Sequence, residues 1–119
     1  MSFLIAFAVL LLTVVGARAG AAGVEAVKPT QNADGTWRFA VTVLHADEGW
    51  DHYANAFVVL TEEGTVLGTR TLAHPHVDEQ PFTRTLNHVE IPEEIDVVYV
   101  RAVDSVHGDG PVVRVPLSR

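Results

Sequence analysis

The sequence predicts an all-β fold: an immunoglobulin- or fibronectin-like antiparallel β-sandwich of about seven strands, preceded by a signal-peptide helix. After residue 20, short segments rich in Val, Thr, Phe and Leu recur, turn-forming residues separate them, and helical periodicity is absent. Seven such segments in a chain of this length are typical of a small sandwich. The strands are predicted at residues 24–28, 37–44, 56–61, 66–72, 82–89, 97–103 and 112–117.

Clusters of turn-forming residues mark the connections between these segments. Asn, Asp and Gly occur at residues 32–35, Glu and Gly at 62–64, Pro and Glu at 91–94, and Gly, Asp and Pro at 108–111. Such residues favour tight turns because they tolerate or fix the backbone angles that turns require. These turn-forming clusters therefore support the prediction of separate short strands.

Alternation within the strands predicts which side chains face the core. In segment 37–44 every second residue from Trp37 to Val43 is large and apolar, so these residues share one buried face. In segment 97–103 the buried set is Val98, Val100 and Ala102, and Asp104 continues the same phase. A carboxylate is thus expected at the end of the core.

The amino-terminal segment has the features of a signal peptide. Residues 3–17 carry no charge, and Ala17-Arg18-Ala19 fits the small-x-small pattern of a cleavage site. This apolar run is shorter than the roughly 20 residues that span a membrane. We therefore expect a signal peptide at 1–19, a sandwich domain at 20–119 and a secreted or periplasmic protein, with retention of the segment as an anchor as the alternative.

The net charge and the absence of cysteine limit the classes of partner that the protein can bind. The formal net charge is −7 and only 8 residues are Lys or Arg, so a basic patch for nucleic acid is lacking. The same charge disfavours strong binding to an anionic membrane surface after signal cleavage. The chain has no cysteine, so the core must suffice or a metal must help to stabilise it. The partners that remain are a metal ion or another secreted protein.

Five of the six histidines are predicted to lie at one end of the sandwich. Successive connections in an antiparallel sandwich alternate between its two ends. If the turn at 32–35 is at one end, the loops at 45–53, 74–80 and 104–109 are at the other, and only His88 lies away from them. We therefore predict a metal site formed by His45, His52, His74, His76 and His107.

The spacing of two histidines strengthens this prediction. His74 and His76 flank a proline that favours extended backbone, in which residues i and i+2 project to the same side and can chelate one ion. Asp51 and Asp104 are candidates to accept the distal N–H of a ligating imidazole, which fixes its tautomer and raises its basicity.

Ligand chemistry narrows the choice of metal. Without cysteine, and with Met1 as the single methionine, blue-copper and thioether Cu(I) sites are excluded. Imidazole and carboxylate ligands suit Cu(II) or Zn(II), bound by simple coordination in a carrier or accessory protein. Calcium is the oxygen-ligand alternative, but no EF-hand loop is present.

The last hairpin suggests a related family. The segment VVYVRAVDSVHGDGPVVRVPL, residues 97–117, resembles the last hairpin of the CopC-like periplasmic copper carriers. The resemblance implies a small secreted sandwich with His107 as a copper ligand and Asp104 as its neighbour. The amino-terminal histidine and the methionine-rich loop of that family are missing, so copper would have to be bound through His45, His74 and His76 instead.

Other features leave alternatives open. Trp50 and Tyr53 could form a platform for a glycan or peptide, which would make the protein a non-metal interaction module, or they could fold back as a lid over the core. The histidines could also form a structural polar network, and a metal with an open coordination position would allow an enzyme. Arg70, Arg84 and Arg101 could bind an anion or pair with carboxylates across strands.

Overall fold

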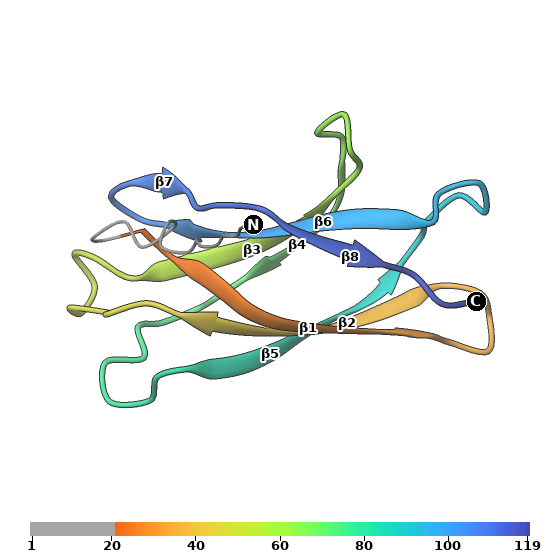
Figure 1. Cartoon of the computed structure of the whole chain (residues 1–119). Helices are drawn as coiled ribbons and strands as arrows, with labels where there is room; N and C mark the ends of the chain where they lie inside the picture. Colours follow the sequence, from red (N-terminus) through yellow and green to blue (C-terminus); the bar gives the residue numbers. More distant parts are fainter. Residues whose placement is uncertain (1–20) are drawn as a thin grey trace, which may run out of the picture.

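The computed structural model describes residues 21–119, which form two antiparallel β-sheets packed face to face (Figure 1). No helix occurs among these residues, so the prediction of an all-β sandwich is confirmed. The predicted signal peptide at 1–19 and its helix lie outside the described residues. Within residues 21–119 there is no helical segment of the length and hydropathy needed to cross a membrane.

The two sheets contain eight strands. The first sheet has the order β1-β2-β5, with β1 at Gly23–Gln31, β2 at Trp37–Leu44 and β5 at Phe82–Val89. The second has the order β4-β3-β6, and β6 also pairs with two short strands near its two ends. Its strands are β3 at Ala54–Leu60, β4 at Val66–Thr71, β6 at Val97–Asp104, β7 at Gly108–Asp109 and β8 at Val113–Pro116.

The seven predicted strands are all present, and two features differ from the prediction. β1 continues past residue 28 through Pro29 to Gln31, which is possible because β1 is an edge strand where a missing N–H need not break a ladder. The short strand β7 lies within the segment expected to be a turn and pairs with the end of β6.

The core consists of the predicted inward-facing side chains. Val98, Val100 and Ala102 of β6 are fully buried, and so are Phe57 and Val59 of β3. Opposite them the first sheet contributes its own alternating set, in which each side chain is at most 1% exposed: Trp37, Phe39, Val41 and Val43. Burial of this much apolar surface is the main stabilising contribution in a domain without disulfides.

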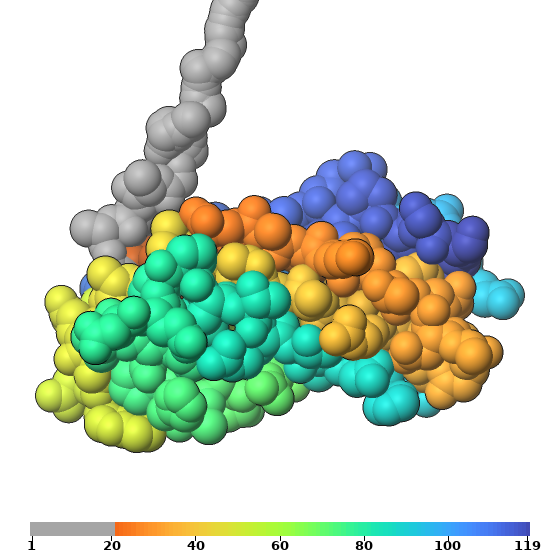
Figure 2. Space-filling model, turned by 90° about the horizontal axis from the view of Figure 1, so that it is seen from below, coloured from red at the N-terminus to blue at the C-terminus, as the bar shows by residue number. Residues whose placement is uncertain are grey.

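The strand register places three loops at one end of the sandwich. The end of β2 lies beside the start of β1 (Leu44 pairs with Gly23), and the end of β6 lies beside the start of β3 (Asp104 pairs with Ala54). The connections at 45–53, 72–81 and 105–107 therefore share one end, at the left in Figure 1, which we call the histidine end. Figure 2 shows the first two of these loops, in yellow and green, gathered at that end. His88 is located near the other end, as predicted.

Backbone atoms surround Gly110 closely beside the histidine end, so a substitution there tests the packing. A Cβ at this position would lie 2.1 Å from the carbonyl oxygen of Ala22 and 3.1 Å from that of Ala102, so backbone would have to move. We expect Gly110→Ala to lower the free energy of unfolding by about 1–3 kcal/mol, the usual cost of overpacking, in urea denaturation. Gly23→Ala is the matched control, because its Cβ would meet nothing closer than 3.8 Å. Equal midpoints for the two variants would contradict the described packing.

Candidate metal centre

His45 closes the core at the histidine end. It follows β2 directly and continues the buried phase of Val41 and Val43, so its imidazole points between the sheets and the residue is only 3% exposed. Its backbone N–H donates to Oε1 of Gln80 at 3.0 Å. The ring is therefore held where the loops of both sheets meet.

Asp47 supports this imidazole from the following turn. The backbone N–H of Asp47 donates to the carbonyl oxygen of His45 at 2.9 Å, and this tight turn brings its Oδ1 to 2.6 Å from Nδ1 of His45. Oδ1 also accepts the N–H of Ala54 at 3.0 Å, and Oδ2 accepts the N–H of His76 at 2.6 Å. The buried carboxylate thus connects loops 45–53 and 72–81 with the start of β3.

His52 reaches the same place through a turn that depends on glycine. Gly49 has a φ of +102°, a conformation that side-chain-bearing residues rarely adopt, and the chain folds back so that the N–H of Glu48 donates to the carbonyl of His52 at 2.8 Å. This places Nδ1 of His52 2.8 Å from Oε1 of Glu48. The His52 side chain is 16% exposed and forms the solvent side of the centre.

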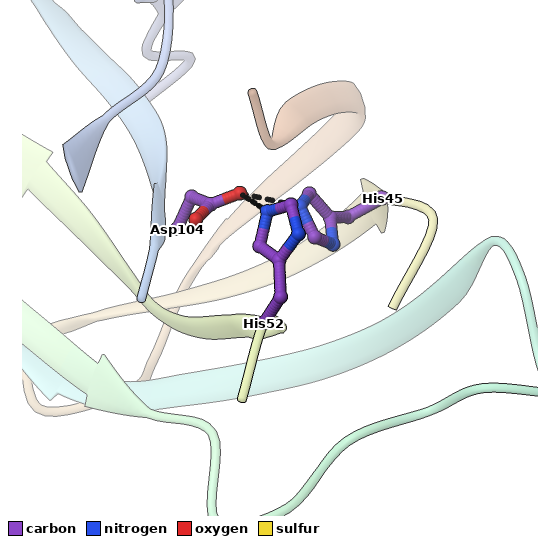
Figure 3. Close-up of side chains that lie close together, drawn as sticks. All are labelled: His45, His52 and Asp104. Atoms are coloured by element: carbon purple, nitrogen blue, oxygen red, sulfur yellow. Dashed lines mark hydrogen bonds and ion pairs between the residues drawn. The ribbon is translucent and has the colours of Figure 1, made fainter. Parts of the chain in front are cut away.

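Asp104 connects the two imidazoles (Figure 3). It is the last residue of β6 and is directed inward, and its Oδ2 lies 2.5 Å from Nε2 of His45 and 2.7 Å from Nε2 of His52. Its other oxygen, Oδ1, accepts the backbone N–H groups of Val106 at 2.6 Å and His107 at 2.9 Å. Both oxygens of this fully buried carboxylate therefore have hydrogen-bond partners.

These contacts determine the ionisation of Asp104. Burial alone would raise its pKa, but the backbone N–H groups of His107 and Val106 donate to the charged form and oppose that effect. The contacts with His52 and His45 act in the same direction, and together they lower the pKa of Asp104 from 3.8 to about 2. The carboxylate is therefore ionised at neutral pH.

The geometry of the group can accommodate a cation. A neutral imidazole has one N–H and one lone pair, yet each ring here faces carboxylate oxygens at both nitrogens. A proton on Nε2 of each ring, or a metal ion near both rings, would satisfy Oδ2 of Asp104. One ligand atom from each of His45, His52 and Asp104 lies within 4.8 Å of the others, so one divalent ion could take the place of two protons.

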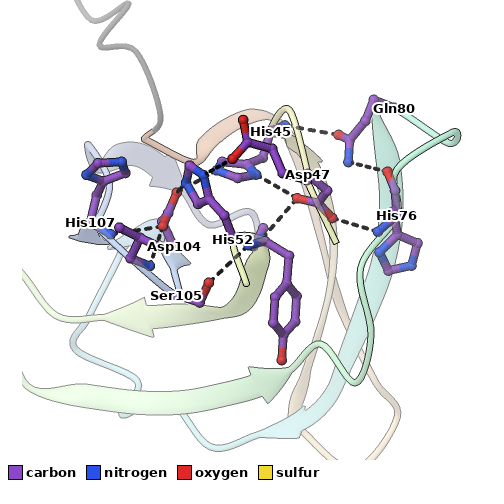
Figure 4. A network of polar contacts seen from close by, with 12 residues as sticks. His45, Asp47, His52, His76, Gln80, Asp104, Ser105 and His107 are labelled. Atoms are coloured by element: carbon purple, nitrogen blue, oxygen red, sulfur yellow. Dashed lines mark hydrogen bonds and ion pairs between the residues drawn. The ribbon is translucent and has the colours of Figure 1, made fainter. Parts of the chain in front are cut away.

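Figure 4 shows the polar contacts around this group, with His107 beside Asp104. His107 is exposed, and its ring centroid lies 5.1 Å from that of His52. Trp50 is 68% exposed and packs edge-on against Tyr53 at 5.7 Å between ring centroids, so it is not folded back over the core as a lid. Asp51, expected to support a ligand, lies exposed on the loop and makes no hydrogen bond or ion pair within residues 21–119.

The structure places His74 and His76 in a separate group. Their ring centroids are 4.6 Å apart, as the His-Pro-His spacing predicts, but Nε2 of His76 accepts a hydrogen bond from Nη2 of Arg84 at 2.9 Å. Burial lowers the pKa of His76, and the charges of Arg84 and His74 lower it further. A guanidinium at the chelating nitrogen opposes a metal ion there by charge repulsion.

Sequence reasoning missed the roles of Asp47 and Glu48. The prediction assigned the support of ligating imidazoles to Asp51 and Asp104, whereas Asp47 and Glu48 contact the Nδ1 atoms and Asp104 contacts the Nε2 atoms. The spacings His-x-Asp and Glu-x-x-x-His are visible in the sequence, but the turns that make these pairs meet are not.

Comparisons with known proteins give one relative. A putative lipoprotein of Halomicrobium mukohataei is 44% identical over 72 residues, which cover 60% of this chain and 35% of the relative. The similarity therefore spans only about a third of that protein. No protein-family model matches the sequence, and no solved structure is significantly similar to it.

The lowered pKa of Asp104 predicts loss of stability in acid. The unfolded chain takes up a proton at this residue near pH 3.8 and the folded chain only near pH 2. The contribution of this carboxylate to the free energy of unfolding is therefore fully present above the unfolded pKa and is lost as the pH falls toward 2. It amounts to on the order of 2 kcal/mol. Asp104→Asn should be less stable at pH 7 and lose less on acidification in denaturation experiments at pH 5 and pH 2.5.

If Asp104→Asn does not fold, the pKa of Asp104 can be measured directly in the unmodified protein. Carbon-13 NMR of the carboxyl groups in the unmodified protein should show Asp104 titrating well below the exposed aspartates. A midpoint near 4 would contradict the assigned hydrogen bonds.

Proposed function

We propose that the protein binds one divalent ion, Cu(II) or Zn(II), through Nε2 of His45, Nε2 of His52 and Oδ2 of Asp104, as an exported carrier or accessory protein. The observation that carries the proposal is the meeting of two imidazoles at one oxygen of a buried, ionised carboxylate. Nitrogen and oxygen ligands without thiolate suit these two metals.

The surroundings of the two rings support the proposal. A ligating histidine usually directs its other ring nitrogen at a carboxylate, which fixes the tautomer and strengthens the ligand. His45 has Asp47 and His52 has Glu48 in this position. Ligand atoms bound to one ion at about 2.0–2.2 Å lie about 3 Å apart, so shifts of less than about 1 Å would accommodate the metal.

His107 is the candidate for a further ligand. Its backbone N–H is held by Oδ1 of Asp104, while its exposed imidazole lies beside that of His52. Rotation of this side chain would bring a third imidazole to an ion on the solvent side. The resemblance of residues 97–117 to the CopC-like hairpin favours the same role for His107.

Export is supported by two observations. The first residues have the composition of a signal peptide, and the relative that is 44% identical over 72 residues is named a putative lipoprotein. A metal carrier outside the cytoplasm would bind its ion through these histidines and release it at lower pH, because protonated imidazole does not coordinate metal.

Calorimetric titration of the metal-stripped protein with Zn(II) and Cu(II) tests the proposal. We expect one-to-one binding with a Kd below about 10 µM at pH 7.5 and weaker binding at pH 5.5. His52→Ala removes the partly exposed ligand and should weaken binding at least about 100-fold, roughly 3 kcal/mol, whereas His88→Ala, at the other end of the sandwich, should leave it unchanged. Binding that survives His52→Ala but disappears in a His74→Ala, His76→Ala double variant would overturn the assignment.

Glu48 and Asp51 provide a second, matched test of the centre. Glu48 contacts Nδ1 of His52, whereas Asp51 is exposed on the same loop without such a contact. Glu48→Gln should lower metal affinity by about tenfold, the small end of the range for carboxylates that support a ligand. Asp51→Asn should leave the affinity within about twofold of the wild type. The reverse order would contradict the described loop geometry.

A non-metal interaction module is the second candidate, and the exposure of Trp50 favours it. An indole that is 68% exposed and packed against Tyr53 offers an aromatic surface to a glycan or a protein. Binding of such a partner that is lost in Trp50→Ala and does not change with metal would favour this function over the first.

A further inference from the structure

Arg70 and Arg84 lie on the two strands that adjoin on one side of the sandwich. β4 and β5 are edge strands of different sheets and adjoin on this side, as the green and turquoise atoms in Figure 2 show. Gly68 of β4 packs against Leu86 of β5 so closely that a Cβ at residue 68 would lie 2.9 Å from Cδ2 of Leu86. The strands run in opposite directions, so Arg70 lies at the level of Arg84.

Both arginines are directed into the space between the sheets. Directly paired residues on neighbouring strands project to the same face. Arg70 pairs with Phe57 and Arg84 pairs with Val41, and both of these apolar partners are fully buried. Both side chains therefore start from the inner faces of facing strands, at the same edge of the core.

Among the described residues, the positive charges of Arg70 and Arg84 are only partly neutralised by carboxylates. Arg84 donates to the carbonyl of Thr83 at 2.8 Å, and its ion pair is with Glu79, 3.5 Å away and largely exposed. Arg70 has no ion pair within residues 21–119, and its Nε is buried without a hydrogen-bond partner. Arg101 also has a buried Nε without a partner, but Asp109 lies 3.3 Å from its guanidinium. Arg70 thus differs from Arg101 in lacking a counter-ion.

His76, which is hydrogen-bonded to Arg84, carries a further donor. Its Nε2 accepts a hydrogen bond from Arg84, so the neutral ring carries its proton on Nδ1, and that atom is buried without a partner in the described part of the chain. The residue is 5% exposed and its ring stacks on Phe82 at 3.9 Å between centroids. A buried N–H without an acceptor is destabilising, and such groups often mark a bound ion or water.

We propose that Arg70, Arg84 and His76 form a binding site for an oxyanion, of phosphate or carboxylate chemistry, on the β4/β5 side of the sandwich. Guanidinium groups bind such anions through paired N–H donors, and one anion would balance the charge of Arg70, which has no ion pair within residues 21–119. The ligand is either a small free anion or a carboxylate on a larger molecule. None of these three residues is a ligand in the proposed metal centre, so the anion proposal does not depend on metal binding.

Titration with inorganic phosphate and with succinate, at constant ionic strength, tests this site. Nitrogen-15 NMR would follow the Nε–H signals of Arg70 and Arg84. We expect saturable shifts with a Kd below about 1 mM for at least one of the two anions. Preference for phosphate would indicate a free phosphate-like anion as the source, and preference for succinate would indicate carboxylate ligands.

Two variants make the test specific. Arg70→Gln should weaken anion binding at least about tenfold, or roughly 1.4 kcal/mol, while Arg101→Gln, whose guanidinium is balanced by Asp109, should leave binding unchanged. Zn(II) affinity should be the same in both variants, so failure of one proposal is distinguishable from failure of the other. Absence of saturable shifts up to about 20 mM anion, or equal binding in wild type and Arg70→Gln, would overturn the oxyanion site.

Discussion

A carboxylate buried at the end of a β-sandwich has to be stabilised by donors on every side, and Asp104 meets this requirement with two imidazoles and two backbone N–H groups. An isolated buried charge would cost many kcal/mol, so the surrounding loops must adopt the conformation that supplies these donors. The turn at 105–107 donates to one oxygen, and His45 and His52 approach the other. The conformation of the loops at the histidine end therefore depends on Asp104.

The same carboxylate explains why the group fits either protons or a metal. With protons between Nε2 and Oδ2, the rings and acids form a satisfied polar network that breaks at large cost if one member is removed. A divalent ion in their place would supply the same positive charge, and Asp47 and Glu48 would keep their contacts with the Nδ1 atoms. The supporting carboxylates are therefore compatible with both states, and under the proposed function metal binding would release protons.

Much of the fold could be predicted because alternation is a local signal. The phase of Trp37 to Val43, and of Val98 to Asp104, can be counted along the sequence, and strand reversal then assigns each loop to an end. Which histidines meet at that end could not be predicted, because it depends on the turn at Gly49 and on contacts between distant segments. His74 and His76 do approach each other, yet Arg84, from an edge strand, occupies the nitrogen expected to bind metal. The CopC-like resemblance remains a prediction.

Nitrogen-15 NMR of the histidine rings, recorded with and without one equivalent of Zn(II), tests the central claim most directly. The account predicts that Nε2 of His45 and His52 acquires the shift of a metal-bound nitrogen, while Nδ1 of each ring keeps its proton and its carboxylate partner. The rings of His74 and His76 should be unchanged. Zinc-induced shifts confined to His74 and His76, or coordination through Nδ1 of His45 and His52, would contradict it.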